Sequence, residues 1–365
     1  MNTKFWTAFS SIEQLDSTFI QRLYNYFGNI ETAFNASLND LKQIEGLSIK
    51  KAENFVQKRD ANGGTNPDKT LEEILSKGIK ILTFEDENYP YMLKQIYNPP
   101  MCLYYKGNLE LCNLEKTVAF VGSRRASLNG KDSVRRIISD LKNTDICIVS
   151  GLATGIDTVS HQSAIENNLK TIGVIASGFD YIYPSANKYL YDKIENECGA
   201  IITEYYPTFE PTKFRFPQRN RIVSGLSYGT IVAEAAIKSG ALITANLTLE
   251  QGRELMCIPG TINNINTEGI FKLLKDGATM VTCGQDILNA LNWSEENIKP
   301  IFNEENLQLN QNEKIIFDII NIEPKGFDEI QAKTGLQTDE LLICLTGMEL
   351  RGLIVQSEGD KYKRA

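Results

Sequence analysis

The stretch Thr117-Val118-Ala119-Phe120-Val121-Gly122-Ser123-Arg124-Arg125 decides how this chain folds. Its first five residues are apolar and rich in β-branched side chains, which predicts a strand buried on both faces. Gly122 ends the strand, because a residue without Cβ lets the backbone turn sharply and lets a ligand approach. Ser123, Arg124 and Arg125 then precede a helical pattern over Gly130–Leu141. Backbone N–H groups, a hydroxyl and guanidinium groups around one point predict an anion site, for which phosphate is the natural ligand.

A second unit of the same kind follows directly. Ile146–Val149 predicts the next strand, and it leads into Ser150–Asp157, another Gly-rich turn before a helix. Two repeats of strand, Gly-rich turn and helix are typical of a doubly wound α/β sheet, in which ligands bind at the carboxyl ends of the strands. Gly151, Gly155 and Asp157 are therefore expected to support the anion site. The alternative is that both turns only connect strands to helices.

The rest of the central region continues this pattern. Short apolar segments predict further strands over Thr171–Ala176, Ala200–Glu204, Thr230–Glu234, Leu255–Ile258 and Thr279–Thr282. Helical segments between them predict one large, extended Rossmann-like, parallel-rich sheet with helices on both faces, and strands at Lys80–Thr83 and Met101–Tyr105 should flank it. Ser239 and Gly240 open a helix at the same edge, where they either line the site or shape it.

Breaker-rich and polar segments divide the chain into four parts: a helical domain over 1–62, the extended Rossmann domain over 63–292, a linker over 293–312 and a winged-helix domain over 313–365. Residues 41–52 resemble a helix-hairpin-helix (the SAM-like class of small helical domains), although Ser48 replaces the second glycine of its turn. Leu353–Gln356, a turn at Gly359 and Tyr362 predict the β-hairpin wing of the winged helix. Its predicted recognition helix begins with Asp339 and Glu340, whose carboxylates would repel DNA phosphates. The first domain is therefore expected to be a small packing or protein-contact domain, and the winged helix a protein-contact surface.

One segment combines positive charge with aromatic rings. Lys213-Phe214-Arg215-Phe216-Pro217-Gln218-Arg219-Asn220-Arg221 contains four cations in nine residues and no acid. Cations for phosphates and flat rings for unstacked bases are what single-stranded nucleic acid requires, and stacking contributes roughly 1–3 kcal/mol per base. We expect Lys213, Arg219 and Arg221 to bind phosphates and Phe216 to stack on a base. The alternative is a solvated charged loop that Phe side chains anchor in the core.

Composition limits the remaining possibilities. The 365 residues predict two or three domains, and hydrophobic (42%) and charged (23%) residues have globular proportions. The sequence has neither an apolar run of about 18 residues nor a signal-peptide core, so a cytoplasmic protein without membrane contact is expected. Seven Cys without a C-x-x-C pair and one His predict no metal, disulfide or cofactor. The net charge of −8 opposes nucleic-acid binding, but screening over about 10 Å lets a local basic cluster prevail.

Several motifs occur in one order along the chain: Gly122-Ser123-Arg124, Ser150–Asp157 with His161 behind it, Tyr183-Pro184, Phe216–Arg221, Ser239–Thr244, Gln251–Glu254 and Pro259-Gly260. By these motifs the chain resembles the bacterial DNA-processing protein A (DprA/Smf) family over nearly its whole length. The resemblance implies a protein that binds single-stranded DNA without sequence preference and protects incoming DNA. It further implies a homodimer through the Rossmann domain and loading of the recombinase RecA in natural transformation. Gly122, Ser123 and Arg124 would hold a phosphate, with Lys213 nearby, and Phe216 would stack on a base.

Three functions remain to be distinguished. A non-catalytic strand-binding mediator explains the cations and aromatic rings, and the pair Asp157 and His161, four residues apart, is expected to cap a helix rather than to perform acid–base chemistry. The alternative is a nucleotide-binding or nucleoside-monophosphate-hydrolysing enzyme on a related fold. Tyr228–Glu234 is only loosely similar to the Gly-Gly-x-Gly-Thr-x-x-Glu turn of such enzymes, and its Glu comes one residue late, which turns it to the opposite face. A transcription regulator is disfavoured by the acidic recognition helix.

Overall fold

The structure, a computed structural model, describes residues 2–293, 309–320, 325–350, 353–357 and 361–364. Residues up to Leu291 form one unit, and the residues from Asn292 onward form a second. Each unit has its own hydrophobic core and is described by itself. Within the described ranges, no helix is long and apolar enough to cross a membrane.

Helices alone make up the amino-terminal part of the first unit: α1 (Thr3–Ser10), α2 (Ser17–Phe27), α3 (Ile30–Asn35), α4 (Leu38–Lys42), α5 (Ile49–Asp60) and α6 (Pro67–Ser76). Polar side chains cap them, as when the Asp16 carboxylate accepts the Phe19 N–H at 2.9 Å. Ser48 is the N-cap of α5, so this replacement of a glycine starts the helix. Phe9 stacks on Phe55, with 4.9 Å between ring centroids, inside a shared aromatic core.

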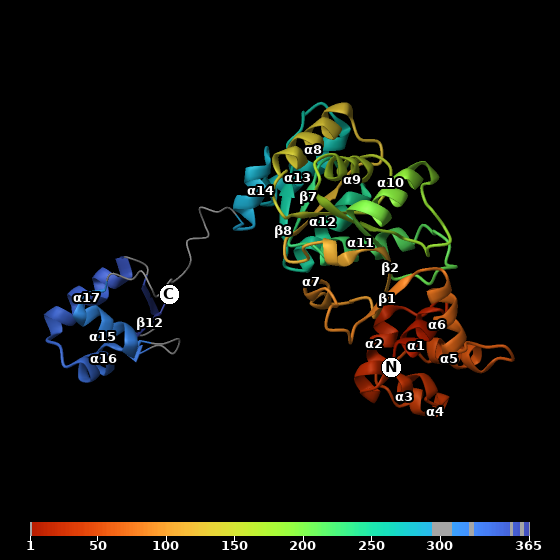
Figure 1. Ribbon diagram of the computed structural model, residues 1–365, viewed down its shortest axis with the longest axis horizontal. Coiled ribbons are helices and arrows are strands. Elements are labelled where there is room, and N and C mark those ends of the chain that lie inside the picture. Colours follow the sequence, from red (N-terminus) through yellow and green to blue (C-terminus); the bar gives the residue numbers. More distant parts are fainter. Residues whose placement is uncertain (1, 294–308, 321–324, 351–352, 358–360, 365) are drawn as a thin grey trace. The chain divides into compact units, whose positions relative to one another are not determined.

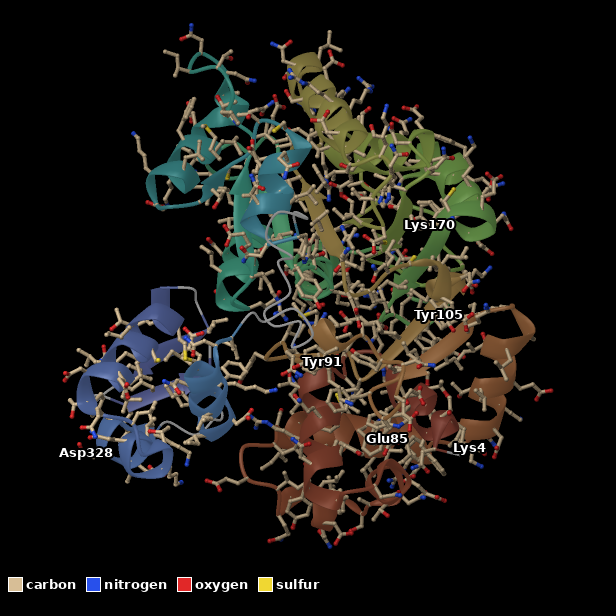
Figure 2. All side chains as sticks on the ribbon, turned by 60° about the vertical axis from the view of Figure 1, so that its left-hand side comes forward. Lys4, Glu85, Tyr91, Tyr105, Lys170 and Asp328 are labelled. Carbon is tan, nitrogen blue, oxygen red and sulfur yellow. The ribbon has the colours of Figure 1, made fainter. Side chains whose placement is uncertain are left out.

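This helical part is joined to the sheet by hydrogen bonds near the surface and by buried apolar contacts. Glu85, labelled in Figure 2, accepts hydrogen bonds at 3.0 Å from Trp6 Nε1 and at 3.0 Å from Tyr24 Oη. Tyr104 and Tyr206, on the sheet side, belong to the same hydrophobic cluster as the amino-terminal helices. The predicted boundary at residue 62 therefore lies inside the first unit, between α5 and α6.

Nine strands of the described chain form one sheet in the order β1-β2-β6-β5-β4-β3-β7-β8-β9. Their bounds are β1 (Lys80–Thr83), β2 (Cys102–Gly107), β3 (Thr117–Val121), β4 (Cys147–Ser150), β5 (Lys170–Val174), β6 (Gly199–Thr203), β7 (Gly229–Val232), β8 (Glu254–Cys257) and β9 (Thr279–Met280). The strands from β6 to β9 in this order pair in parallel, whereas β1 and β2 add an antiparallel edge. The predicted parallel-rich sheet with flanking strands is confirmed. The chain reverses its direction of progress across the sheet between β3 and β7.

Helices cover both faces of the sheet (Figure 1). They are α7 (Tyr91–Lys94), α8 (Leu128–Asp140), α9 (Ile156–Glu166), α10 (Lys188–Lys193), α11 (Arg215–Gly225), α12 (Gly240–Glu250), α13 (Glu268–Lys275) and α14 (Gly284–Ala290). α8 packs against α9 and α14, while α11 packs against α12 and α7. The basic segment 213–221 is thus not an irregular loop, because from Arg215 onward it is the first part of α11.

The second unit has the winged-helix arrangement that the sequence predicts. Its helices are α15 (Gln311–Ile319), α16 (Phe327–Thr334) and α17 (Thr338–Leu350), and its strands are β10 (Lys325–Gly326), β11 (Ile354–Ser357) and β12 (Lys361–Arg364). The strands form a sheet in the order β10-β12-β11, and β11 with β12 is the predicted hairpin. Ile316, Ile330, Leu341 and Leu345 belong to its core. The predicted turn at Gly359, and most of the predicted linker, lie outside the described residues.

Candidate nucleic-acid interface

The predicted site residues meet at a cavity of about 530 Å³ at the carboxyl ends of the parallel strands. Gly122 follows β3, Gly151 follows β4, and Ser239 lies beyond the end of β7. The cavity thus lies at the point where strand order reverses, between β3 and β7, which is the usual ligand site of open α/β sheets. The first two turns of α11 form another wall.

Two glycines let the loops after β3 and before α9 touch. An added Cβ on Gly122 would stand 2.6 Å from Cγ1 of Ile156. Gly155 has a φ of +84°, and an added Cβ there would stand 2.2 Å from the carbonyl oxygen of Ser123. The Ile156 N–H donates to that same oxygen at 3.2 Å. Gly155 therefore supports the Gly-Ser-Arg loop from behind, without lining the cavity itself.

Two buried side chains of opposite charge, Arg219 and Asp157, form the floor of the cavity without a direct hydrogen bond between them. Arg219 is only 4% exposed, and its Nη1 donates to the Gly151 carbonyl at 2.7 Å and to the Val174 carbonyl. The Asp157 carboxylate lies beside it, since an added Cβ on Gly151 would be 2.4 Å from Arg219 Nη2 and 2.7 Å from Asp157 Oδ2. Burial raises the pKa of Asp157, although the positive charge of Arg219 opposes this effect. Arg219 thus ties the ends of β4 and β5 together.

Exposed groups above this floor are those that a nucleic acid would meet. The guanidinium carbon of Arg124 lies 4.8 Å from the centroid of the Phe216 ring. The Tyr183 ring lies 5.5 Å from the same ring at 57°. Arg124 and Lys213 are exposed, whereas Phe216 is half-buried. The guanidinium of Arg124, the rings of Phe216 and Tyr183 and the ammonium of Lys213 therefore lie at one opening.

The start of α12 completes the wall. Ser239 is the N-cap of this helix, and its Oγ accepts the Ala241 N–H at 3.2 Å. Gly240 follows as the first helical residue, and a Cβ added there would meet no heavy atom within 4 Å, so this part of the wall is open. The partial positive charge of the helix start favours a bound anion here.

The structure brings together most of the predicted residues. Those that line the cavity are Gly122, Arg124, Gly151, Asp157, Lys213, Phe216, Arg219, Ser239 and Gly240. Ser123 turns its hydroxyl to its own loop, where it accepts the Arg125 N–H at 3.1 Å. Arg221 faces away and pairs with Glu204. Sequence reasoning did not name Tyr183, Asn220 and Thr244 as lining residues, although each lies inside one of the motifs quoted above.

The hydrogen bonds of His161 and of two carboxylates, Asp157 and Glu234, show which groups they contact. His161 does not pair with Asp157, because Nδ1 of the buried His161 lies 2.7 Å from Thr171 Oγ1, where α9 packs on the sheet. Asp157 alone fixes the turn, since its carboxylate accepts the Ala153 N–H at 3.3 Å. The Glu234 carboxylate accepts the Ser127 N–H at 2.9 Å and the Asn264 Nδ2–H at 3.3 Å. Glu234 thus fastens two loops behind the Gly-Ser-Arg turn.

No group of three or more His, Cys, Asp or Glu side chains within the described ranges is placed to hold a metal ion. None of the seven cysteines, all of which lie within the described ranges, is in a disulfide.

Two family models match the parts of the chain that form the sheet and the winged helix. The model of the family "DNA recombination-mediator protein A" matches residues 80–292, and that of the "DprA winged helix domain" matches residues 303–360. DNA processing protein DprA of Streptococcus pneumoniae is 49% identical over 203 residues, which cover 56% of this chain and 71% of that protein. Protein Smf of Synechocystis is 31% identical over 394 positions, covering 99% of this chain and 98% of Smf.

Solved structures agree with these relatives. The crystal structure of DprA from S. pneumoniae has a TM-score of 0.68 at 38% identity and covers 79% of this chain and 97% of that one. A structure of DNA processing protein A from Helicobacter pylori, described as revealing its single-stranded DNA binding mode, has a TM-score of 0.52 at 30% identity. It covers 59% of this chain and 95% of that one. By sequence, by domain order and by fold, this chain belongs to the DNA recombination-mediator protein A (DprA/Smf) family.

Proposed function

We propose that the cavity binds single-stranded DNA without sequence preference. The observation that supports this most directly is the grouping of Arg124, Lys213, Phe216 and Tyr183 at one opening. Cations neutralise phosphates and flat side chains stack on unpaired bases, and neither interaction depends on base identity. The H. pylori relative, whose structure is described in terms of single-stranded DNA binding, supports the assignment.

The local charge at the cavity explains how an acidic chain binds a polyanion. Its charged lining residues are Arg124, Lys213, Arg219 and Asp157. Because Asp157 and Arg219 neutralise each other in the floor, Arg124 and Lys213 remain as the cations that face a ligand. Only charges within about 10 Å act strongly at physiological salt, so the net charge of −8 matters less than these two.

The wider role that we propose is that of a non-catalytic mediator. The chain would act as a homodimer through its Rossmann domain, protect incoming strands and load RecA onto them, as membership of a recombination-mediator family supports. The alternative, a nucleotide-hydrolysing enzyme, would use the carboxylate that ends the Tyr228–Glu234 stretch. Glu234 accepts hydrogen bonds from Ser127 and Asn264, which accounts for it as a loop fastener.

A titration of fluorescent oligo-dT tests the site. Wild-type affinity should fall as salt rises, with a log–log slope of about −0.7 for each phosphate neutralised. Arg124→Ala should weaken binding about tenfold or more and make the slope shallower by about 0.7, because one cation–phosphate contact is lost.

The matched control is Arg125→Ala. Arg125 is also exposed and carries the same charge one residue away, but it does not line the cavity. Its loss should therefore change affinity much less than the loss of Arg124. Equal effects of the two substitutions, or a salt-independent affinity, would contradict the proposed site.

A further inference from the structure

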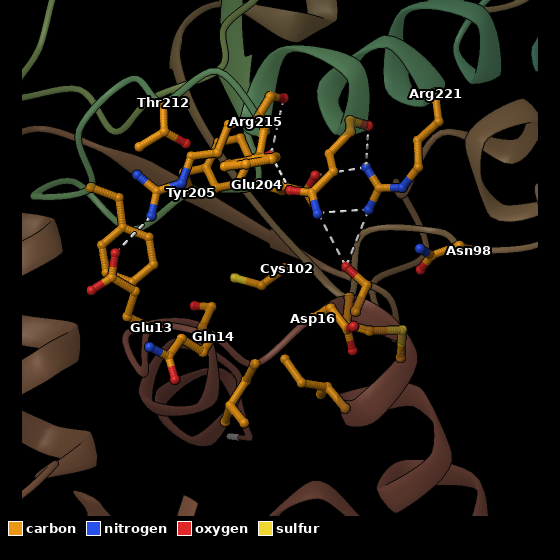
Figure 3. Close-up of a pocket in the computed structure, with 18 residues that line it drawn as sticks. Glu13, Gln14, Asp16, Asn98, Cys102, Glu204, Tyr205, Thr212, Arg215 and Arg221 are labelled. Atoms are coloured by element: carbon orange, nitrogen blue, oxygen red, sulfur yellow. Dashed lines mark hydrogen bonds and ion pairs between the residues drawn. The ribbon is translucent and has the colours of Figure 1, made fainter. Parts of the chain in front are cut away.

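Two faces of helix α11 line two different cavities. Phe216, Arg219 and Asn220 face the DNA cavity. Arg215, Gln218 and Arg221 face a second cavity of about 400 Å³, whose opposite wall includes the connection between α1 and α2 (Figure 3). Any force on the second face therefore acts on the helix that presents Phe216 to DNA.

The first contact across this second cavity joins Glu13 to Arg215. Nη2 of Arg215 lies 3.0 Å from Oε1 of Glu13, and Nη1 donates to the Glu210 carbonyl. The same guanidinium stacks on two rings, at 5.1 Å from the Tyr205 centroid and 4.8 Å from the Phe209 centroid. Arg215 is the first residue of α11 and is 9% exposed, so its position fixes where the helix begins.

The second contact joins Ser17 to Arg221. Arg221 and Glu204 form a bidentate pair with both N···O distances at 2.6 Å. Ser17, the first residue of α2, bonds to both partners from beside this pair: its hydroxyl donates to Glu204 Oε2 at 3.1 Å and accepts from Arg221 Nη2 at 3.2 Å. Figure 3 shows the side chains of Glu204, which follows β6, and of Arg221, in α11, turned toward each other.

The connection that supplies Glu13 and Ser17 is itself held in one shape. Gln14, between them, has a φ of 74°, which few residues other than glycine adopt. Asp16 caps α2 and pairs with Lys51 of α5. A strained backbone with anchored neighbours persists only where surrounding contacts hold it. The amino-terminal helices can therefore transmit their position to α11.

We propose that Glu13 and Ser17 are positioning residues for DNA binding. With Glu204, Arg215 and Arg221 they form what we call the α11 clamp, which holds Phe216 in stacking distance of Arg124 and Tyr183. The role of the α11 clamp in DNA binding rests on the function that we propose for the cavity. Because coupling between two sites is reciprocal, DNA in the cavity should also tighten the clamp.

Glu13→Gln tests the clamp through the sign of its effect. Removing a negative charge should by itself strengthen binding to a polyanion. The clamp predicts the opposite, an oligo-dT affinity about two- to fivefold lower, because the ion pair that fixes the start of α11 is gone. The log–log salt slope should stay at the wild-type value, since no phosphate contact is removed.

The control is Asp68→Asn. Asp68 pairs with Lys4 at 2.9 Å within the same helical part and touches neither α11 nor the cavity. It removes the same charge, so its affinity should be unchanged or slightly higher. Ser17→Ala, which changes no charge, should again lower affinity about two- to fivefold while Arg221 and Glu204 still hold each other.

Hydrogen exchange provides a second readout. Oligo-dT should slow amide exchange at residues 12–17 of the wild type, and this protection should be smaller in Ser17→Ala. If wild-type protein binds and Arg124→Ala does not, yet Glu13→Gln and Ser17→Ala bind like wild type, the clamp is refuted and the DNA site stands. If Arg124→Ala also binds like wild type, the proposed function itself fails.

Discussion

Arg219 shows how one residue can belong to a binding site and yet act mainly on the protein. Its guanidinium donates hydrogen bonds to the Gly151 and Val174 carbonyls and is stabilised by the charge of the neighbouring Asp157. Burying an unpaired charge is costly, so these partners account for its place under the cavity. The residues that remain available to a phosphate are Arg124 and Lys213, which are exposed. Affinity should therefore be concentrated in these two side chains.

His161 predicts an acid sensitivity. Burial lowers its pKa to about 3, and Nε2 has no hydrogen-bond partner. In the unfolded chain the pKa is about 6.5, so below that pH the unfolded state binds a proton that the folded state excludes, and stability falls as pH falls from 6.5 toward 3. Between pH 7 and pH 5 the loss from this residue should be about 2 kcal/mol.

Urea unfolding of wild type and His161→Gln at these two pH values measures that loss. Glutamine carries no titrating group, so the difference between the two proteins in free energy of unfolding should shrink as the pH falls. Only the change of this difference between pH 7 and pH 5 is interpreted, so any pH-independent effect of the substitution on the free energy of unfolding cancels. Parallel pH profiles for the two proteins would contradict a buried, neutral His161.

At the scale of elements, the turn before α9 supports the Gly-Ser-Arg loop. Gly155→Ala should weaken oligo-dT binding, because the new Cβ would stand 2.2 Å from the Ser123 carbonyl and 2.7 Å from the Arg124 carbonyl, and the loop must shift. The cost in stability should be about 1–3 kcal/mol.

Gly252→Ala is the control, because its φ is +66° but no heavy atom lies within 4 Å of the new Cβ. It should lower thermal stability without changing DNA affinity; equal affinity losses would mean that backbone strain, not the loop contact, is responsible.

The helical register of α11 explains which part of the site the sequence could predict. Gly-rich turns after apolar strands were sufficient to bring Gly122, Gly151 and Ser239 to one edge, because parallel strands end at the same side of a sheet. Arg219 and Arg221 are two residues apart, so in a helix they point about 200° away from each other and cannot both face one cavity. Charge composition alone does not reveal that register. Tyr183 was missed because its contact with Phe216 joins segments that no local pattern connects.

At the scale of the whole molecule, the cavity and the winged helix belong to different units. All residues that line the cavity lie between Val121 and Thr244, whereas α17 of the second unit begins with Asp339 and Glu340 in its first turn. Carboxylates at the start of a recognition helix repel phosphates. The two units should therefore respond differently to DNA.

Hydrogen exchange of the full chain with saturating oligo-dT measures this difference. A ligand at about 100 times its Kd stabilises the state that binds it by about 2.7 kcal/mol, which slows global-opening exchange in the unit that holds it. Amides of β3, β4 and α9 should gain protection, while core amides of α15 and α16 should exchange as they do without DNA. Arg124→Ala at the same DNA concentration should remove the gain in β3 and β4. Comparable protection around Ile316 and Ile330 would place DNA contacts on the winged helix as well, because only binding linked to that unit's folding can slow the exchange of its core.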